Sequence, residues 1–124
     1  MAKFIHDDVL NAALNYIKSN ASKMYACSAL PTTYNEATST YALADVAVAS
    51  GDFTLADGDA SGRKVTVGAK SGVTVDTSGT ITHIAIVDDT NSKLLLVTTV
   101  TSRAVLASDK IDIPAFDDEI ADPS

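Results

Sequence analysis

The chain has a single cysteine, Cys27, and no tryptophan. One thiol cannot form an internal disulfide, and a single cysteine cannot supply a metal site that needs several. A nucleophilic cysteine needs a partnering base, and only two histidines, His6 and His83, could serve. We therefore expect Cys27 to be a buried and unreactive thiol, as free cysteines usually are.

Basic residues are also scarce. Nine Lys and Arg stand against 16 Asp and Glu, which gives a formal net charge of −7, and both halves of the chain are acidic. Nucleic-acid binding needs clustered Lys and Arg, so we expect no nucleic-acid partner. No apolar run approaches membrane-spanning length, and Asp7 and Asp8 interrupt any signal-peptide core. We expect synthesis in a cytoplasm and no membrane partner.

The most prominent features of the sequence are two long apolar runs. Residues 80–87 and 93–100 are rich in β-branched residues, contain neither Gly nor Pro, and flank the turn-prone residues 88–92. This pattern predicts a β-hairpin. Because neither face of the first arm is fully polar, we expect the hairpin to be central and covered on both sides.

One helix is predicted over residues 7–21. Apolar residues recur there at helical spacing, and Asp7 or Asp8 can cap its start. The stripe contains Val9, Leu10, Ala13, Leu14 and Ile17. We expect it to pack against a sheet, and an amphipathic helix that binds a partner is the alternative.

The length of 124 residues fits a single domain, 1–124. A β-rich body is predicted over about 23–120, with a long polar loop at 31–41 and an acidic, solvated C-terminal tail at 117–124. Short strands with turn signals about every ten residues are typical of antiparallel sandwiches and barrels. The predicted fold class is mainly β (α+β), an antiparallel β-sandwich or barrel-like domain with one N-terminal amphipathic helix.

Residues 57–62 (DGDASG) begin like a calcium-binding loop. Such a loop needs a bidentate acid at its twelfth position, which here is Gly68, and Arg63 and Lys64 place positive charge within it. We therefore interpret the segment as a polar hairpin turn. His6 beside Asp7 and Asp8 lacks the convergent ligands of a zinc site, and we predict no metal site.

Enzymatic activity is not expected either. Asp88–Asp89 and residues 117–119 offer neighbouring carboxylates, but general acid–base pairs need one desolvated member and a substrate pocket. A turn and a chain end supply neither. The sequence has no Gly-rich phosphate loop and no Gly-x-Ser-x-Gly motif. We predict no catalytic residue and no cofactor.

The order of segments resembles that of small virion structural proteins of tailed bacteriophages. The resemblance spans almost the whole chain, is one of overall pattern, and includes no catalytic motif. It is carried by residues 11–17 (NAALNYI), 27–34 (CSALPTTY), 57–65 (DGDASGRKV), 76–79 (DTSG), 83–88 (HIAIVD), 93–95 (KLL) and 119–123 (EIADP).

The resemblance implies a capsid decoration or cement protein that binds the outer surface of the capsid and bridges major capsid subunits. A neck, tail or fibre-base component is the alternative. The expected partners are the major capsid protein or other virion proteins and further copies of this chain, with a homotrimer favoured. On this view the contact residues would be Phe4, Pro31, Thr33, Tyr34 and Tyr41, because tyrosines give a loop adhesive contact area.

Overall fold

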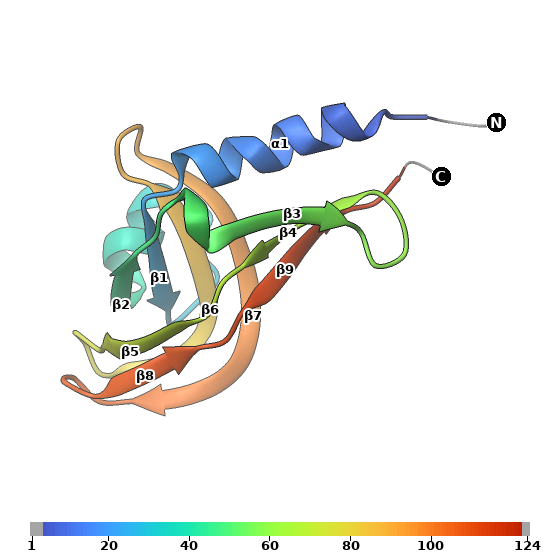
Figure 1. Ribbon diagram of the computed structural model, residues 1–124. Coiled ribbons are helices and arrows are strands. Elements are labelled where there is room, and N and C mark those ends of the chain that lie inside the picture. Colours follow the sequence, from blue (N-terminus) through green and yellow to red (C-terminus); the bar gives the residue numbers. More distant parts are fainter. Residues whose placement is uncertain (1–3, 123–124) are drawn as a thin grey trace. The chain divides into compact units, whose positions relative to one another are not determined.

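The computed structural model describes residues 4–122 (Figure 1). One long helix precedes nine strands in this part of the chain, and every strand pairing is antiparallel, which confirms the predicted mainly-β fold with an N-terminal helix. The elements are α1 (Asp7–Asn20), β1 (Lys23–Cys27), η1 (Glu36–Thr40), β2 (Ala42–Ala47), η2 (Ser50–Asp52), β3 (Phe53–Asp57), β4 (Arg63–Val67), β5 (Lys70–Thr74), β6 (Gly79–Asp88), β7 (Lys93–Val105), β8 (Lys110–Ile113) and β9 (Phe116–Ile120).

The chain forms two compact units, each assembled from separate segments. Unit 1 contains α1, η2, β3, β4 and β9, and unit 2 contains β1, η1, β2 and β5 to β8. The predicted single domain, 1–124, thus comprises two clusters of mutually contacting elements.

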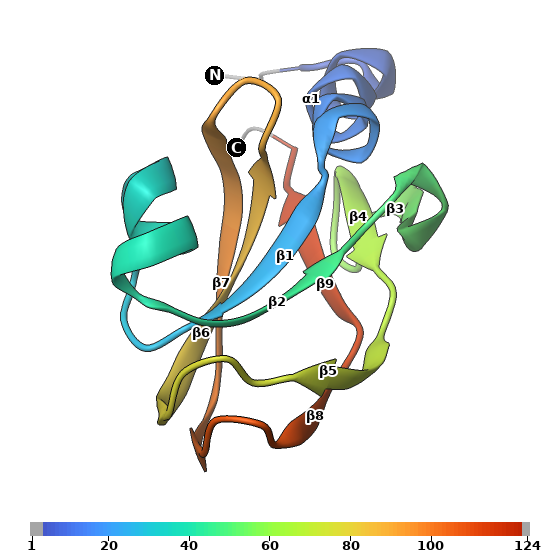
Figure 2. The same ribbon diagram turned by 90° about the vertical axis from the view of Figure 1, so that its left-hand side faces the viewer.

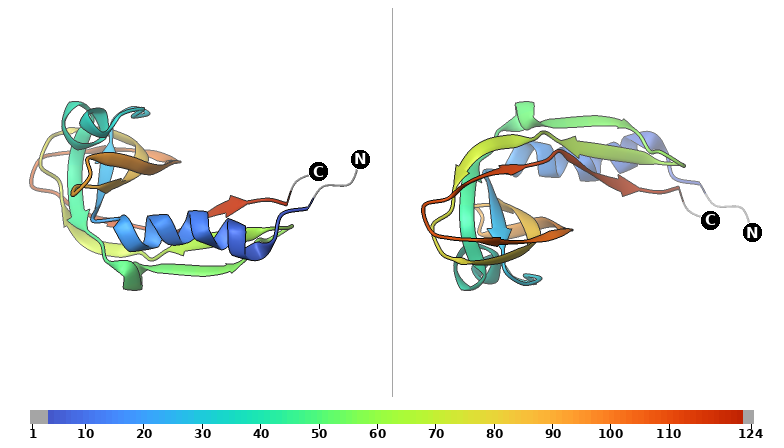
Figure 3. Two further views of the ribbon diagram at one scale, coloured as in Figure 1. Left: turned by 90° about the horizontal axis from the view of Figure 1, so that it is seen from above. Right: turned by 90° about the horizontal axis from the view of Figure 1, so that it is seen from below.

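Unit 1 is a helix packed on a three-stranded sheet of order β3-β4-β9. Figure 3 shows α1 running alongside these strands. The strands pair so that Phe53, Val67 and Phe116 are neighbours on one face of the sheet. Alternate residues of a strand share a face, and Phe53, Val65 and Val67 are all buried. This apolar face forms the core of the unit.

Helix α1 contributes less to that core than its sequence predicts. Leu10 and Leu14, one turn apart, are buried, and Ile17 is half-buried. Val9 and Ala13 are exposed. The prediction that all five residues of the stripe pack on the sheet was therefore wrong for these two, because three strands cover only part of the apolar surface of the helix.

His6, and not Asp7 or Asp8, caps the start of α1. Its carbonyl accepts a hydrogen bond from the amide of Val9 at 2.9 Å, and its ring Nδ1 accepts one from the amide of Asp8 at 3.0 Å. Both aspartates lie in the first turn, where carboxylates interact favourably with the helix dipole. The predicted caps are thus shifted by one or two residues.

Unit 2 contains a four-stranded sheet of order β2-β1-β6-β7 and the ribbon β5-β8 (Figure 2). A single antiparallel bridge between Ala44 and Val75 links β2 to the segment that follows β5. The predicted central hairpin is present as β6 and β7, with Asp88 opposite Lys93 at its end. The second predicted hairpin, around residues 57–62, is present in unit 1 as β3 and β4.

Strand β6 is covered on both faces, as predicted. On one side Ile84 and Ile86 pair with Ala26 and Met24 of β1, and all four side chains are buried. On the other side the core cluster contains Cys27, Ala37 of η1, Ala85 and Val87, with Tyr25, Tyr34, Tyr41, Leu94 and Val97 packed against it. The prediction was wrong for β7, which is the last strand of its sheet and is exposed or half-buried at every residue except Val105.

Candidate interaction surfaces

The segment 31–41 is folded, not an open loop. It turns through a short helical stretch that ends in the π-helix η1, and the amide of Tyr41 bonds the carbonyl of Glu36 at 2.8 Å. The Glu36 carboxylate accepts hydrogen bonds from the amide and the hydroxyl of Thr32, both at 2.9 Å. These bonds hold the pKa of Glu36 below its usual value. The prediction of a long irregular loop was wrong, because local side-chain bonds to the backbone supply a turn that hydropathy does not reveal.

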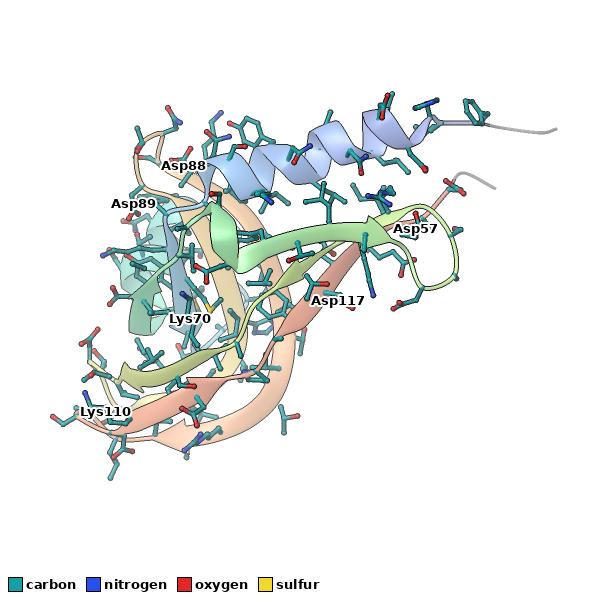
Figure 4. The ribbon with its side chains drawn as sticks, viewed as in Figure 1. Asp57, Lys70, Asp88, Asp89, Lys110 and Asp117 are labelled. Atoms are coloured by element: carbon teal, nitrogen blue, oxygen red, sulfur yellow. The ribbon has the colours of Figure 1, made fainter. Side chains whose placement is uncertain are left out.

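Tyr34 fastens this segment to the β6–β7 turn. Its hydroxyl donates a hydrogen bond of 2.7 Å to the Asp89 carboxylate, and this bond, with some burial, raises the pKa of Tyr34 to about 12. The amide of Asp89 in turn bonds the hydroxyl of Ser22 at 2.8 Å. Asp88 and Asp89 are labelled at this turn in Figure 4. Three segments distant in sequence are therefore joined by side-chain hydrogen bonds.

The five residues predicted to contact a partner have different surroundings. Pro31 is buried, and Tyr34 and Tyr41 pack on the core cluster of unit 2. Thr33 is exposed, but its hydroxyl accepts the amide of Glu36 at 3.1 Å. Phe4 is 81% exposed. The structure therefore gives Pro31, Tyr34 and Tyr41 roles within unit 2 and leaves Phe4 as the largest exposed side chain of the five.

The acidic loop between β3 and β4 is held by basic residues of its own hairpin. Arg63 contacts Asp57 at 2.7 Å, and Lys64 contacts Asp59 at 2.8 Å and Asp117 of β9 at 3.2 Å. The bonds to Asp59 and Asp117 raise the pKa of Lys64. The carboxylates of Asp57 and Asp59 thus have basic partners in the hairpin, and Asp57 and Asp117 are labelled in Figure 4.

Two glycines shape that loop. Gly62 has a φ of +70°, and a Cβ there would lie 1.9 Å from the carbonyl oxygen of Ile120. A Cβ on Gly58 would meet the carbonyl of Ser61. The glycine spacing that resembles a calcium loop therefore has a steric reason in this hairpin.

Asp88 has a structural role in the β6–β7 turn. It is 1% exposed and accepts hydrogen bonds from the amides of Thr90 and Asn91 and from the Asn91 side chain. The Asn91 side chain contributes most to holding the pKa of Asp88 below its usual value. These contacts and the bond from Tyr34 to Asp89 show that the carboxylates of Asp88 and Asp89 both stabilise the β6–β7 turn.

Asp45 and Asp76 form a second pair of neighbouring carboxyl groups, which the sequence does not reveal. Asp45 of β2 lies close to Asp76, and the neighbouring Asp45 carboxyl raises the pKa of Asp76. Lys23 lies 3.3 Å from Asp45. The bridge from Ala44 to Val75 brings the two aspartates together across 31 positions of sequence. Among residues 4–122 no group of three or more His, Cys, Asp or Glu side chains is placed to hold a metal ion.

Cys27 and His83 lie on paired strands, β1 and β6. Cys27 is buried, as predicted, and desolvation raises the pKa of its thiol to about 11. A thiol held in its protonated form is a poor nucleophile. His83 is half-buried, and its Nδ1 lies 2.8 Å from the hydroxyl of Thr82.

The largest exposed apolar groups of unit 1 lie on α1 and just before it. Val9 is 61% exposed and Tyr16 is 43% exposed, and with Ala13 they follow the i, i+4, i+7 spacing of one helix face. Phe4 and Ile5 precede this face and are also exposed. We call Phe4, Ile5, Val9, Ala13 and Tyr16 the apolar face of α1. Contiguous exposed apolar groups often mark protein–protein contacts.

A second exposed feature is the outer edge of β7. Over the described residues β7 pairs only with β6, so its other edge presents unpaired backbone groups. Leu94, Leu95, Leu96, Val97 and Val100 are half-buried. The edge therefore combines backbone donors and acceptors with partly exposed aliphatic side chains.

The predicted β-rich body, about 23–120, and the predicted acidic, solvated tail, 117–124, overlap at residues 117–120. Residues 117–120 belong to β9, which pairs with β4 from Arg63 to Val67. Thr66 donates a hydrogen bond to Asp117 at 2.7 Å. This stretch therefore belongs to the predicted β-rich body, its Asp117 and Glu119 side chains are exposed, and residues 123–124 lie outside the described part of the chain.

A scan against protein-family models and searches of curated proteins and of solved structures found no match to this chain. Within residues 4–122 no helix is both long enough and apolar enough to cross a membrane. The two exposed surfaces, the apolar face of α1 and the outer edge of β7, are the features from which a function can be argued.

Proposed function

We propose that the protein is a virion structural component of a tailed bacteriophage, and that it decorates the capsid by binding its outer surface. The segment pattern of the sequence suggests this class. The observation that carries the proposal is the apolar face of α1, where Val9 and Tyr16 are exposed, as is Phe4.

The apolar face of α1 suits a contact with a preformed protein surface. An amphipathic helix typically inserts residues spaced by one helical turn into an apolar groove, and Val9, Ala13 and Tyr16 have that spacing. Asp7 and Asp8 lie in the adjacent first turn. We therefore propose that the receiving groove belongs to the major capsid protein and has basic residues at its rim.

Weak contacts are enough for such a role. Many copies bind one lattice, and multivalent contacts add avidity where each copy also touches its neighbours. The proposal includes assembly of this chain with itself, a trimer being favoured, because a trimer could bridge several capsid subunits at once.

The test is the occupancy of capsids that lack this protein after incubation with purified variants. Val9→Gln with Tyr16→Gln should reduce occupancy about tenfold or more, because the loss of two anchor side chains typically costs several kcal/mol. Asn15→Gln is the matched control, since Asn15 is an exposed residue away from the apolar face and should leave occupancy unchanged.

Unchanged occupancy of the double variant, with its fold intact, would remove the apolar face of α1 from the contact. Binding of the wild-type protein to isolated tails but not to capsids would move the protein to the neck or tail. Raised salt should weaken binding to capsids, because the proposed contact between the first turn of α1 and a basic rim is screened by ions.

A further inference from the structure

Two strands that end their sheets carry opposite charge. Strand β7 is the last strand of the four-stranded sheet, and its only charged residues are Lys93 and Arg103. Strand β9 is the last strand of the three-stranded sheet, and three of its five residues are Asp117, Asp118 and Glu119. One edge is therefore purely basic in its charges and the other purely acidic.

The β7 edge has only part of the usual protection against pairing. Natural edge strands are short, twisted by bulges, or carry proline and inward-pointing charges that prevent association with other chains. The pairing of β7 with β6 shifts register twice, but β7 has 13 residues against ten in β6 and contains neither Pro nor Gly. Its Leu94–Val97 stretch is half-exposed. Such an edge fits a protein that adds a strand from a partner.

Arg103 and Asp118 are the charges left over on these two strands. Arg103 is exposed and makes no ion pair within residues 4–122. Asp118 is half-buried and likewise has no basic partner there. Asp117 and Glu119 already have partners, since Asp117 contacts Lys64 and Thr66 and Glu119 accepts the amide of Ala60.

We propose that the outer edge of β7 in one copy pairs in antiparallel fashion with the outer edge of β9 in a second copy, with Arg103 of one beside Asp118 of the other. Pairing of β7 with β7 would bring only cations together, and pairing of β9 with β9 would bring only carboxylates together. Like charges on facing strands are destabilising, whereas opposite charges add favourable cross-strand energy.

This contact joins different surfaces of the two copies, so the first copy keeps its β9 edge and the second keeps its β7 edge available for further pairing. A contact of this kind closes into a ring or continues as a filament. The inference goes beyond the proposed function, because it concerns copies of this chain in solution and holds whether or not a capsid is the partner.

The test is analytical ultracentrifugation of the full chain over a concentration series, without capsids. The wild-type protein should associate reversibly. Arg103→Glu and Asp118→Lys should each weaken association about tenfold or more, because each replaces an attractive pair by a repulsive one. The double variant Arg103→Glu with Asp118→Lys reverses both charges and should restore association. An equimolar mixture of the two single variants should form pairs between unlike copies.

Two further variants keep the result decisive. Lys110→Glu makes the same charge change as Arg103→Glu on an exposed residue of β8 and should leave association unchanged. Thr99→Glu adds a negative charge to the exposed middle of β7 without altering unit 1, and should weaken association with the acidic edge of β9 even if Asp118→Lys fails to fold.

A wild-type protein that stays monomeric throughout the series would overturn the proposal. So would single variants that associate as well as the wild type, or a folded double variant that does not recover. If Arg103→Glu changes only the occupancy of capsids and the protein is otherwise a monomer, the β7 edge belongs to a contact with the capsid, and pairing between copies is refuted.

Discussion

Unit 2 buries a larger share of its apolar residues than unit 1, which leaves most of its own outside the core. Of the 22 buried apolar residues in the described chain, five lie in unit 1 and 17 in unit 2. Of the six large exposed apolar residues, four lie in unit 1, namely Phe4, Ile5, Val9 and Tyr16. A helix laid on one face of a three-stranded sheet cannot cover its own second apolar face, and the remaining surface is available to a partner.

The largest expected effect comes from the small core of unit 1. Phe53 is 1% exposed and is the largest fully buried side chain, so Phe53→Ala should cost about 3–5 kcal/mol of stability. Because unit 1 has few other buried residues to retain the fold, hydrogen exchange should show lost protection in β3, β4 and β9 while β1 and β6 stay protected.

Ile86→Ala in the core of unit 2 is the matched control and should have the reverse pattern. It should cost about 2–5 kcal/mol and remove protection from β1 and β6 first. If both variants lose protection uniformly along the chain, the two units unfold as one, and the difference between them has no thermodynamic meaning.

The next effect concerns how unit 2 holds its turn. Tyr34→Phe removes the hydrogen bond to Asp89 and should lower the free energy of unfolding by about 1–2 kcal/mol at neutral pH. The pKa of Tyr34 is raised from 10.0 to about 12, so its contribution is fully present below pH 10 and is lost as the pH rises toward 12. Urea unfolding at neutral pH and at high pH measures both effects.

A double-mutant cycle isolates this bond. Asp89→Ala removes the acceptor, so the pKa of Tyr34 should fall in that variant. If Tyr34→Phe costs as much in the Asp89→Ala background as in the wild type, the bond contributes nothing and the segment 31–41 is held against the turn by packing alone.

The elements that the sequence predicted correctly are those set by neighbouring residues. Helix α1 ends within one residue of the predicted range 7–21, and both predicted hairpins form. Their causes are local: apolar spacing, β-branched runs and turn residues such as those at positions 57–62. Burial of Cys27 was also predictable from its mixed apolar surroundings.

The candidate surfaces depend on which strands become neighbours, and one sequence does not encode that visibly. Both arms of the central hairpin are similarly apolar, yet β6 lies inside its sheet and β7 at its edge. The sequence predicted Tyr34 to be a residue that contacts a partner protein. Its actual partner, Asp89, could not be recognised because it lies 55 positions away in the sequence. The same limit applies to Asp45 with Asp76, which only the strand bridge brings together.

A smaller effect is expected at Asp118, on the sheet of unit 1. Desolvation raises its pKa, and the amide of Glu119 opposes this shift. When the pKa of a carboxyl is raised in the folded state, the folded protein becomes less stable as the pH rises from the unfolded-state pKa through the folded-state pKa. Asp118→Asn should therefore stabilise a dilute, unassociated sample by up to about 0.5 kcal/mol at neutral pH and give no gain at acidic pH.

The same variant separates the free chain from the assembled one. At concentrations where copies associate, Asp118→Asn should weaken association, because it removes the charge proposed to face Arg103. Thermal unfolding at low concentration and sedimentation at high concentration should then move in opposite directions. Equal changes in both would mean that Asp118 acts only within unit 1.

The smallest effect on stability is expected on the apolar face of α1, and it decides what that face is for. Val9→Gln and Tyr16→Gln alter exposed side chains on a helix held by Leu10 and Leu14, and glutamine is a good helix former. Each should change the free energy of unfolding by less than about 0.5 kcal/mol, as measured by urea unfolding. A loss of about 2 kcal/mol or more, the cost of emptying a core site, would show that these residues stabilise unit 1, and any loss of capsid binding would then follow from unfolding instead of a missing contact.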